Sequence, residues 1–247
     1  VTSGKGGVGK TMLSCNLSAC LSRLGQRVAI VDADLGLANA HVVLGVAPRY
    51  HLEHVLSDQC DLMDALTPAP YGMLLLAGGS GIASLANLSD ERRLRLIESL
   101  SELDELADTV IVDTGAGLSD NVIGFVLAAE EAIIVTTPEP TAMADAYATI
   151  KVVLRENPNA RLRILINMAR TSQKAQSAWL RLQLVTRQFL DKEIEFLGAI
   201  PADNSVLKAI RSQELLVISD PHCAASRAID SIARILTTAP VRSMGMP

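Results

Sequence analysis

The stretch Gly4-Lys5-Gly6-Gly7-Val8-Gly9-Lys10-Thr11 decides the fold of this 247-residue chain. It fits the phosphate-loop pattern G-x-x-x-x-G-K-[ST], in which glycines let the backbone turn tightly so that its N–H groups point at a phosphate. In this pattern Lys10 reaches the β- and γ-phosphates, and the Thr11 hydroxyl binds Mg²⁺. We therefore expect the loop, with Met12 directly after it, to bind ATP or ADP together with Mg²⁺.

The residues around this loop predict a strand before it and a helix after it. Val1-Thr2-Ser3 is short and β-like, and Met12–Leu24 has the character of a helix. The positive N-terminal end of that helix would face the same anion as the loop. The first strand looks cut short, so we expect residues to be missing upstream.

The second lysine of the loop, Lys5, stands where a generic phosphate loop accepts almost any residue. The string KGGVGKT resembles the deviant Walker A motif of the MinD/ParA family of ATPases. In that family the early lysine crosses a dimer interface and touches the partner subunit's nucleotide. The resemblance implies that Lys5 acts in trans, as an arginine finger does in other NTPases, and that the protein forms a homodimer with ATP.

Apolar runs alternate with amphipathic stretches along the chain, which is the pattern of a parallel sheet covered on both faces. Apolar residues make up 49% of the sequence and aromatic residues 3%, as is typical of buried parallel strands. We predict a single-domain α/β fold of the P-loop NTPase kind, with a mostly parallel sheet and helices on both faces. The expected strands are Val28–Val31, Met73–Leu76, Thr109–Val112, Ala132–Thr136, Leu162–Asn167 and Glu195–Ile200. The expected helices are Met12–Leu24, Asp90–Leu103, Ser119–Ala128, Ala142–Glu156, Gln173–Leu190, Ser205–Ile210 and Ala224–Leu236.

Three aspartates at the ends of expected strands supply the acids that a phosphate loop needs. Carboxylates at such positions fall on the ligand side of an open α/β sheet. By resemblance, Asp32 lies near the water shell of Mg²⁺ and Asp34 orients the attacking water. An ordinary aspartate is a poor base at neutral pH, with a pKa of about 3.9, so slow turnover is expected. Asp113 follows an apolar run, as a water-mediated Mg²⁺ ligand in a Walker B strand would. The expected catalytic residues are Lys5, Lys10 and Asp34, and the expected metal-site residues are Thr11, Asp32 and Asp113.

The ends of the last two expected strands would hold the adenine. In the resembling family, the positions of Asn167 and of Ile200-Pro201-Ala202-Asp203 together enclose the adenine. The asparagine side chain hydrogen-bonds to the edge of the base. The resemblance therefore assigns Asn167, Pro201 and Asp203 to nucleotide binding. A strand-capping role for Asn167 is the alternative.

Four strings point beyond the general family. They are Asp34-Leu35-Gly36-Leu37-Ala38-Asn39-Ala40, Leu76-Ala77-Gly78-Gly79-Ser80-Gly81-Ile82, Asp113-Thr114-Gly115-Ala116-Gly117-Leu118-Ser119 and Thr136-Thr137-Pro138-Glu139-Pro140-Thr141. Together they resemble a MinD-like branch, the flagellar-number regulators called FlhG or FleN. The resemblance implies partners: an FlhF-like GTPase, an AAA+ transcription activator of flagellar genes and a flagellar switch protein. A MinD-type protein that positions the division site, and a ParA-type protein that partitions DNA, are the alternatives.

The resemblance covers residues 1–236, which we predict to be the ATPase domain, followed by a loose tail over residues 237–247. MinD-like proteins end in a basic amphipathic helix that inserts into membranes. The last expected helix here has an apolar stripe that we expect to pack on the sheet instead. That stripe consists of Ala225, Ile229, Ile232 and Leu236. Peripheral contact of the intact protein with the inner face of the cell membrane stays open.

Charge is uneven along the chain, whose formal net charge is −5. Residues 1–150 hold 8 basic and 19 acidic residues, whereas residues 151–192 hold 9 basic and 2 acidic ones. The basic stretch would suit nucleic acid, acidic lipid, an acidic partner or simply solvent. Its aromatic residues Trp179 and Phe189 mark either a partner site or contact with the core. The acidity of the whole chain makes nucleic-acid binding the less favoured interpretation.

The four cysteines form no C-x-x-C pair, and the four histidines show no metal-binding spacing, so zinc and redox dithiol chemistry are not expected. Cys15 and Cys20 lie on the first expected helix and should be small buried side chains. No stretch approaches the ~18 apolar residues of a membrane span. Together these features predict a cytoplasmic protein.

Overall fold

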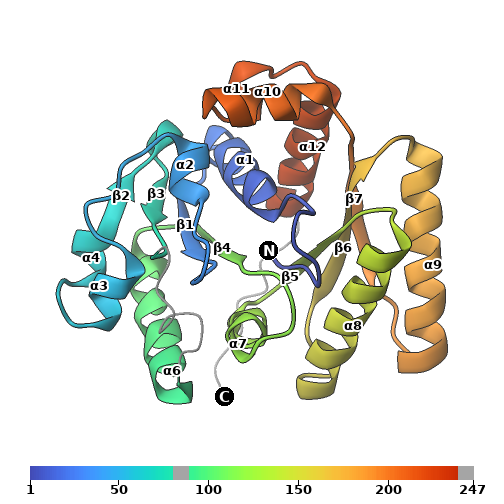
Figure 1. Ribbon diagram of the computed structural model, residues 1–247, viewed down its shortest axis with the longest axis horizontal. Helices are drawn as coiled ribbons and strands as arrows, with labels where there is room; N and C mark the ends of the chain where they lie inside the picture. The colour runs from blue at the N-terminus through green and yellow to red at the C-terminus, as the bar shows by residue number, and fades with distance from the viewer. Residues whose placement is uncertain (80–88, 239–247) are drawn as a thin grey trace.

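The computed structural model describes residues 1–79 and 89–238 of the chain (Figure 1). Its strands form two hydrogen-bonded ribbons, with the order β2-β3-β1-β4 in one and β5-β6-β7 in the other. All neighbouring strands run parallel except β2, which pairs antiparallel with β3 at one edge. The strands are β1 (Val28–Ala33), β2 (Leu66–Pro68), β3 (Leu74–Leu76), β4 (Thr109–Thr114), β5 (Ala132–Thr136), β6 (Leu162–Ala169) and β7 (Glu195–Pro201).

The first three residues join the two ribbons into one sheet. On the β5 side, Thr2 N donates to Ile133 O at 2.9 Å, and Val135 N donates to Thr2 O at 2.8 Å. On the β4 side, Thr114 N donates to the Val1 carbonyl at 3.1 Å. The β-like character predicted for Val1-Thr2-Ser3 is therefore confirmed, and the phosphate loop leaves from the middle of the sheet.

Helices cover both faces of this sheet (Figure 1). On one face lie α1 (Lys10–Arg23) and α12 (Ala224–Thr238), with α2 (Ala40–Leu44), α10 (Asn204–Ser212) and α11 (Leu216–Ser219) beside them. On the other face lie α6 (Asp90–Ser99), α7 (Asp120–Ala128), α8 (Pro140–Glu156) and α9 (Ser172–Leu190). The short helices α3 (Leu52–Leu56) and α4 (Leu62–Ala65) lie near the β2 edge, and the short 3-10 helices η1 (Pro70–Gly72) and η2 (Leu100–Glu105) precede β3 and β4.

Side chains along each strand alternate between the two faces of the sheet, so the hydrophobic core is divided between those faces. In β1, Val28 and Ile30 pack into the cluster around α1 and α12, whereas Ala29 and Val31 pack into a cluster beneath α6 and α7. Successive side chains of a strand point to opposite faces, so a strand buried on both sides reads as a continuous apolar run. The predicted α/β architecture, with a mostly parallel sheet and helices on both faces, is confirmed.

Every predicted helix and strand is present, with ends that differ by a few residues. The predicted second helix ends at Ser99, and the chain continues as η2. The sequence analysis did not predict α2, α3, α4, β2, η1 and α11, since each has at most five residues and shows little periodicity. α12 extends to Thr238, two residues beyond the predicted end. Parts of two predictions, Ser80-Gly81-Ile82 and residues 239–247 of the tail, lie outside the described residues.

The last helix packs on the sheet, as predicted. Ala225, Ile229 and Ile232 are buried in the cluster that includes β5 and β7, and Leu236 packs at its margin. Cys15 and Cys20 are both fully buried, as also predicted. Within residues 1–79 and 89–238, no helix has the length and apolar content needed to cross a bilayer.

Candidate nucleotide site

The phosphate loop turns through two glycines that have left-handed backbone conformations. Gly7 has φ 78°, and Gly9, which begins α1, has φ 89° and ψ 26°. Residues with a Cβ rarely adopt these angles, so glycine is required at both positions. Leu13 N makes the first intrahelical hydrogen bond, to Gly9 O at 3.0 Å. The preceding N–H groups of residues 10–12 therefore remain for an anion at the helix N-terminus, as the sequence predicts for Lys10, Thr11 and Met12.

Close contacts hold the loop between α8 and β6. A Cβ on Gly4 would lie 2.3 Å from the Asp145 carbonyl oxygen of α8. A Cβ on Gly9 would lie 2.6 Å from Asn167 Nδ2, at the end of β6. By contrast, a Cβ on Gly6 would have no neighbour within 4 Å. The loop is thus packed at its two ends and open in its middle, where a phosphate would approach.

Lys10 is buried beneath the loop, with 8% of its surface exposed. Its Nζ donates to Ser3 Oγ at 3.0 Å, and Ser3 Oγ donates to the Lys5 carbonyl at 2.8 Å. Burial lowers the pKa of Lys10, and the nearby charges of Asp113 and Asp34 oppose that shift. The lysine therefore sits among the two predicted acids, with one neutral hydroxyl partner.

Asp113 closes the floor of the site at the end of β4. Its Oδ1 accepts a hydrogen bond from Ser14 Oγ at 2.9 Å, whereas its Oδ2 is buried with no hydrogen-bond partner. Burial raises the pKa of Asp113, while the hydroxyls of Thr11 and Ser14 lower it. A buried carboxylate oxygen without a partner is costly unless something else satisfies it.

This unpaired oxygen beside Thr11 fits a hydrated cation. In the described part of the chain, no three His, Cys, Asp or Glu side chains are grouped so that they could hold a metal by themselves. Mg²⁺ prefers oxygen ligands, keeps several waters and is commonly shared with nucleotide phosphates. The residues present thus fit a Mg²⁺ held by the Thr11 hydroxyl, by Asp113 through water and by the nucleotide.

Asp32, at the end of β1, organises the loop that follows it. Its Oδ2 accepts hydrogen bonds from Asn39 N and Ala40 N, both at 2.9 Å, and its Oδ1 accepts one from Asp34 N at 3.2 Å. Burial raises the pKa of Asp32 to about 7, although these N–H donors oppose the shift. Residue 32 therefore carries a structural role at the N-terminus of α2, and its proximity to Mg²⁺ stays a prediction.

Asp34 lies where the loop after β1 meets the loop after β4. A Cβ on Gly115 would lie 3.4 Å from Asp34 Oδ1, so the aspartate carboxylate stands over the Gly115 backbone. The same Oδ1 accepts a hydrogen bond from Leu37 N at 3.2 Å. Gly117, two residues further, has φ 101°, which favours glycine. The loops after β1 and β4 thus lie against each other at the predicted water-orienting residue.

Lys5 reaches away from the loop toward the start of α8. Its Nζ donates to Thr141 Oγ1 at 3.1 Å and lies 3.5 Å from Glu139 Oε2. Its side chain is 41% exposed, and that of Glu139 is 70% exposed. The early lysine is therefore at the surface of the site, held by exposed partners from its own chain.

The predicted adenine contacts lie at or just after the ends of the neighbouring strands β6 and β7. Asn167 is buried at the end of β6, where its Nδ2 donates to Val8 O at 2.8 Å and ties the strand to the phosphate loop. Pro201 pairs with Ala169 at the end of β7. Asp203 caps α10 through Ser205 N at 3.0 Å and also accepts from Ala225 N, at the start of α12, at 3.2 Å. The structure thus brings the three residues to one edge, and their contact with adenine stays a prediction.

Four further residues of the site were not assigned by the sequence analysis. They are Ser3, Ser14, Glu139 and Thr141, the partners of Lys10, Asp113 and Lys5. Ser3 directly precedes the loop and Ser14 lies one helical turn after Lys10, so the local sequence held a signal for both. Glu139 and Thr141 lie more than 130 residues away from Lys5, and no local pattern predicts that pairing.

The loop, the buried lysine and the acid at the end of β4 together define a P-loop nucleotide-binding protein. Comparison with known proteins agrees with that class. The family model of the ParA proteins, described as NUBPL iron-transfer P-loop NTPase, matches residues 1–237. The chain belongs to the ParA/MinD family of P-loop NTPases.

Two relatives and one solved structure refine this placement. The chain is 41% identical over 241 residues to the Antiactivator FleN of Pseudomonas aeruginosa, covering 98% of this chain and 86% of that protein. It is 33% identical to the Flagellum site-determining protein YlxH of Helicobacter pylori, covering 96% of this chain and 81% of that protein. It resembles the septum site-determining protein MinD from Pyrococcus horikoshii OT3, complexed with Mg-ADP, with a TM-score of 0.81 and 26% identity over 96% and 94% of the two chains. The predicted family and branch are confirmed.

The predicted cofactors, ATP or ADP with Mg²⁺, are likewise confirmed by the family and by the Mg-ADP in that MinD structure. The family model's description also includes iron transfer. The four cysteines are free thiols: Cys15 and Cys20 are buried residues of α1, and Cys60 and Cys223 are half-buried elsewhere. None of them lies in the phosphate loop or in the loops after β1 and β4, so the chain offers no thiolate set at the site for an iron–sulfur cargo.

Proposed function

We propose that this chain is an ATP-binding, slowly hydrolysing switch that dimerises with ATP and controls the number or placement of flagella through partner proteins. The observation that carries this proposal is the 41% identity to FleN, which extends over 98% of the chain. An intact phosphate loop within that alignment supports nucleotide-dependent action. The name of that relative, an antiactivator, favours a transcription activator among the predicted partners.

The proposed cycle assigns a role to each residue of the site. Lys10 and the N–H groups at the start of α1 bind the phosphates, while Thr11 and Asp113 hold the Mg²⁺, which supplies charge neutralisation when bound. Asp34 positions a water, and its contact with Gly115 supports coupling between the two loops during hydrolysis. Lys5 leaves Glu139 and reaches across to the nucleotide of a second copy.

Two substitutions test this cycle in the purified protein. Lys5→Ala should abolish ATP-dependent dimerisation, measured by sedimentation velocity, while ADP binding persists. Asp34→Ala should still dimerise with ATP and should lose at least ~tenfold in hydrolysis rate. An Asp34→Ala protein that hydrolyses ATP at the wild-type rate would contradict the role of Asp34, and unimpaired Lys5→Ala dimers would contradict the role of Lys5.

Deletion of the gene separates the flagellar function from its alternatives. We expect altered flagellar number or placement, counted by electron microscopy, with normal cell division. Minicells with normal flagella would instead assign the chain to division-site positioning, and cells without DNA would assign it to DNA partition. In either case the nucleotide chemistry proposed for the site would still stand.

A further inference from the structure

The outer face of α9 carries leucines where a solvated helix would carry polar residues. Ala178 and Leu182 are buried against the sheet, together with Ala175 and Thr186. At 100° per residue, Leu180 and Leu184 fall on the opposite side of the helix. They are 51% and 65% exposed. A single exposed leucine needs no explanation, but two adjacent ones at the centre of a solvent face indicate a covered surface.

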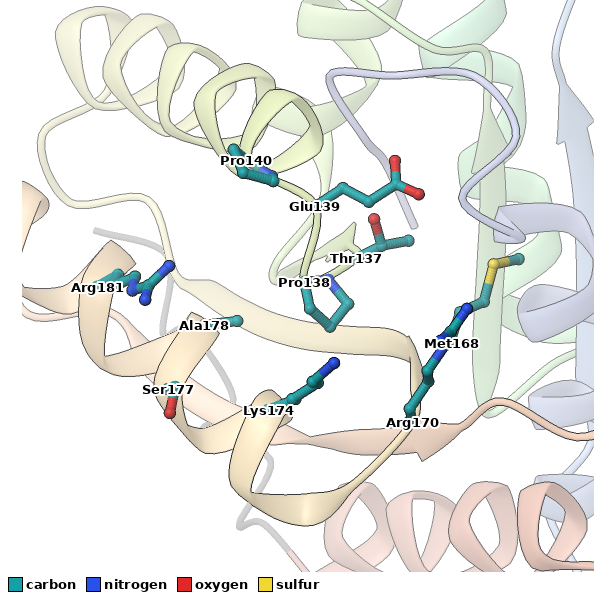
Figure 2. Close-up of a pocket in the computed structure, with 10 residues that line it drawn as sticks. All are labelled: Thr137, Pro138, Glu139, Pro140, Met168, Arg170, Lys174, Ser177, Ala178 and Arg181. Atoms are coloured by element: carbon teal, nitrogen blue, oxygen red, sulfur yellow. The ribbon is translucent and has the colours of Figure 1, made fainter.

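Two hollows lie along α9, one at the two leucines and the other beside Lys174 and Arg181. One, of about 520 Å³, is lined by α9 alone, including both leucines and Arg187. The other, of about 540 Å³, lies between α9 and the start of α8 and has an apolar floor of Pro138, Met168 and Ala178 (Figure 2). The outer side of the helix therefore presents recesses between its side chains, a shape that receives side chains from a second helix.

Positive charge borders the same surface. Arg170, Lys174 and Arg181 line the larger hollow and are exposed (Figure 2). Within the described ranges none of these three side chains forms an ion pair or a hydrogen bond, whereas Arg187 pairs with Glu193. Three unpaired cations beside two exposed leucines favour a ligand that combines acidic and apolar groups.

We propose that the α9 docking face, formed by Lys174, Leu180, Arg181, Leu184 and Arg187, binds an amphipathic helix of a partner protein whose apolar stripe is bordered by aspartate and glutamate. The face spans about 20 Å along α9, enough for three to four turns of a partner helix. Leucines one turn apart match the apolar stripe, and the unpaired Lys174 and Arg181, together with Arg187, match its acidic border. This assignment names a partner surface and rests on the proposed regulatory function.

The charge distribution favours an acidic helix over nucleic acid. Duplex binding depends on many phosphate contacts, whereas the larger hollow also contains the carboxylate of Glu139. The formal net charge of the chain is −5, which opposes a long polyanion but not a short acidic segment. A second copy of this chain fits less well, because its α6 carries three arginines as well as three acidic residues beside the exposed Leu94.

The test uses two fluorescein-labelled helical peptides of about 18 residues, or five turns, with the same leucine positions. One carries glutamate beside the leucines and the other carries lysine. Fluorescence anisotropy with the full chain should show saturable binding of the glutamate peptide and none of the lysine peptide. Leu180→Ala/Leu184→Ala and Lys174→Glu/Arg181→Glu should each weaken binding at least ~tenfold.

A matched variant distinguishes specific binding at the α9 docking face from nonspecific hydrophobic binding elsewhere on the surface. Leu207 and Ile210 on α10 are 57% and 47% exposed and lie beside Lys208 and Arg211. Leu207→Ala/Ile210→Ala should leave peptide binding within ~twofold of wild type. An equal loss in this variant overturns the proposal, as does equal binding of both peptides or no saturable binding below ~1 mM.

Two further results would reassign the surface. Tighter binding of a DNA duplex of about two helical turns, lost in Lys174→Glu/Arg181→Glu, overturns the acidic helix in favour of nucleic acid. Concentration-dependent self-association that Leu180→Ala/Leu184→Ala abolishes overturns it in favour of a second copy. The peptide measurement needs neither ATP hydrolysis nor flagella, so failure here and failure of the proposed switch are distinguishable.

Discussion

Lys5 Nζ lies 3.5 Å from Glu139 Oε2, across 134 residues of sequence. The family resemblance predicts that this lysine contacts the nucleotide of a second copy. In this structure its ammonium group instead contacts Glu139 and Thr141 of its own chain. Both charged side chains are largely exposed, and exposed ion pairs contribute about 0–1 kcal/mol. The contact is therefore weak enough to exchange for a phosphate, and it opposes dimerisation only modestly.

Removing the charge at residue 139 should make dimerisation easier. In Glu139→Gln, Lys5 loses its anionic partner and is freed for the second copy. We expect half-maximal dimerisation at an ATP concentration up to ~fivefold lower than in the wild type, measured by sedimentation velocity. Glu130→Gln, an exposed glutamate with no hydrogen bond or ion pair in the described structure, serves as the control. Weaker dimerisation in Glu139→Gln would show that the glutamate supports the dimer instead.

Gly9→Ala should destabilise the folded protein even without nucleotide. A Cβ there meets Asn167 Nδ2 at 2.6 Å, and the φ of 89° is itself unfavourable for alanine. We expect the free energy of unfolding to fall by about 1–3 kcal/mol, measured by urea denaturation. Gly6→Ala is the matched control in the same loop, since its Cβ meets nothing within 4 Å and its φ is not in the left-handed region. Equal losses in the two variants would contradict this account of the loop.

Asp113→Asn should reduce the effect of Mg²⁺ on nucleotide binding. The unpaired Oδ2 is the acceptor that fits the water shell of the metal, and an amide satisfies such water less well. We expect the gain in ADP affinity on adding Mg²⁺ to fall at least ~tenfold, about 1.4 kcal/mol, when titrations with Mg²⁺ and with EDTA are compared. Ser14→Ala removes only the Oδ1 hydrogen bond and should change that gain less. An unaltered dependence on Mg²⁺ in Asp113→Asn would exclude this carboxylate from the metal site.

Asp203→Ala should reveal a stabilising contribution that depends on pH. The Asp203 carboxylate accepts from backbone N–H groups at the starts of α10 and α12, and the Ser205 N–H is the main cause of its lowered pKa. Because folding lowers the pKa of Asp203, its carboxylate stabilises the fold fully above the unfolded pKa of about 3.9. This stabilisation is lost as pH falls through the pKa of the folded state. Urea denaturation should show a loss of about 1–2 kcal/mol at neutral pH that shrinks below pH ~4.

A carboxylate without partners provides the comparison for that experiment. Asp104 is exposed and makes no hydrogen bond or ion pair in the described part of the chain. Asp104→Ala should change the free energy of unfolding by no more than ~0.5 kcal/mol at either pH. If the loss in Asp203→Ala is the same at both pH values, the carboxylate charge is not what stabilises the two helices.

The phosphate loop and the acids around it were predictable because their chemistry is local. Gly7 and Gly9 need left-handed backbone angles, and Lys10 and Thr11 follow at fixed positions on the first helical turn, so one short string specifies the geometry. The burial of β1 on both faces was equally predictable, since a short unbroken apolar run is typical of a strand covered on both sides. The short helices α2 and α11 could not be predicted, because a helix of four or five residues shows little of the helical repeat in its sequence.

The sequence by itself determined an α/β fold, a nucleotide site and the family, since all three depend on residue types at fixed spacing along the chain. Only the tertiary structure decided which distant groups meet: the side chains of Lys5 and Glu139, the Asp34 carboxylate and the Gly115 backbone, and the Asn167 amide and the Val8 carbonyl. It also decided that Leu180 and Leu184 face solvent, because which side of a helix is buried depends on the elements packed against it. Contacts between distant residues arise from the packing of whole elements, and no local pattern encodes them.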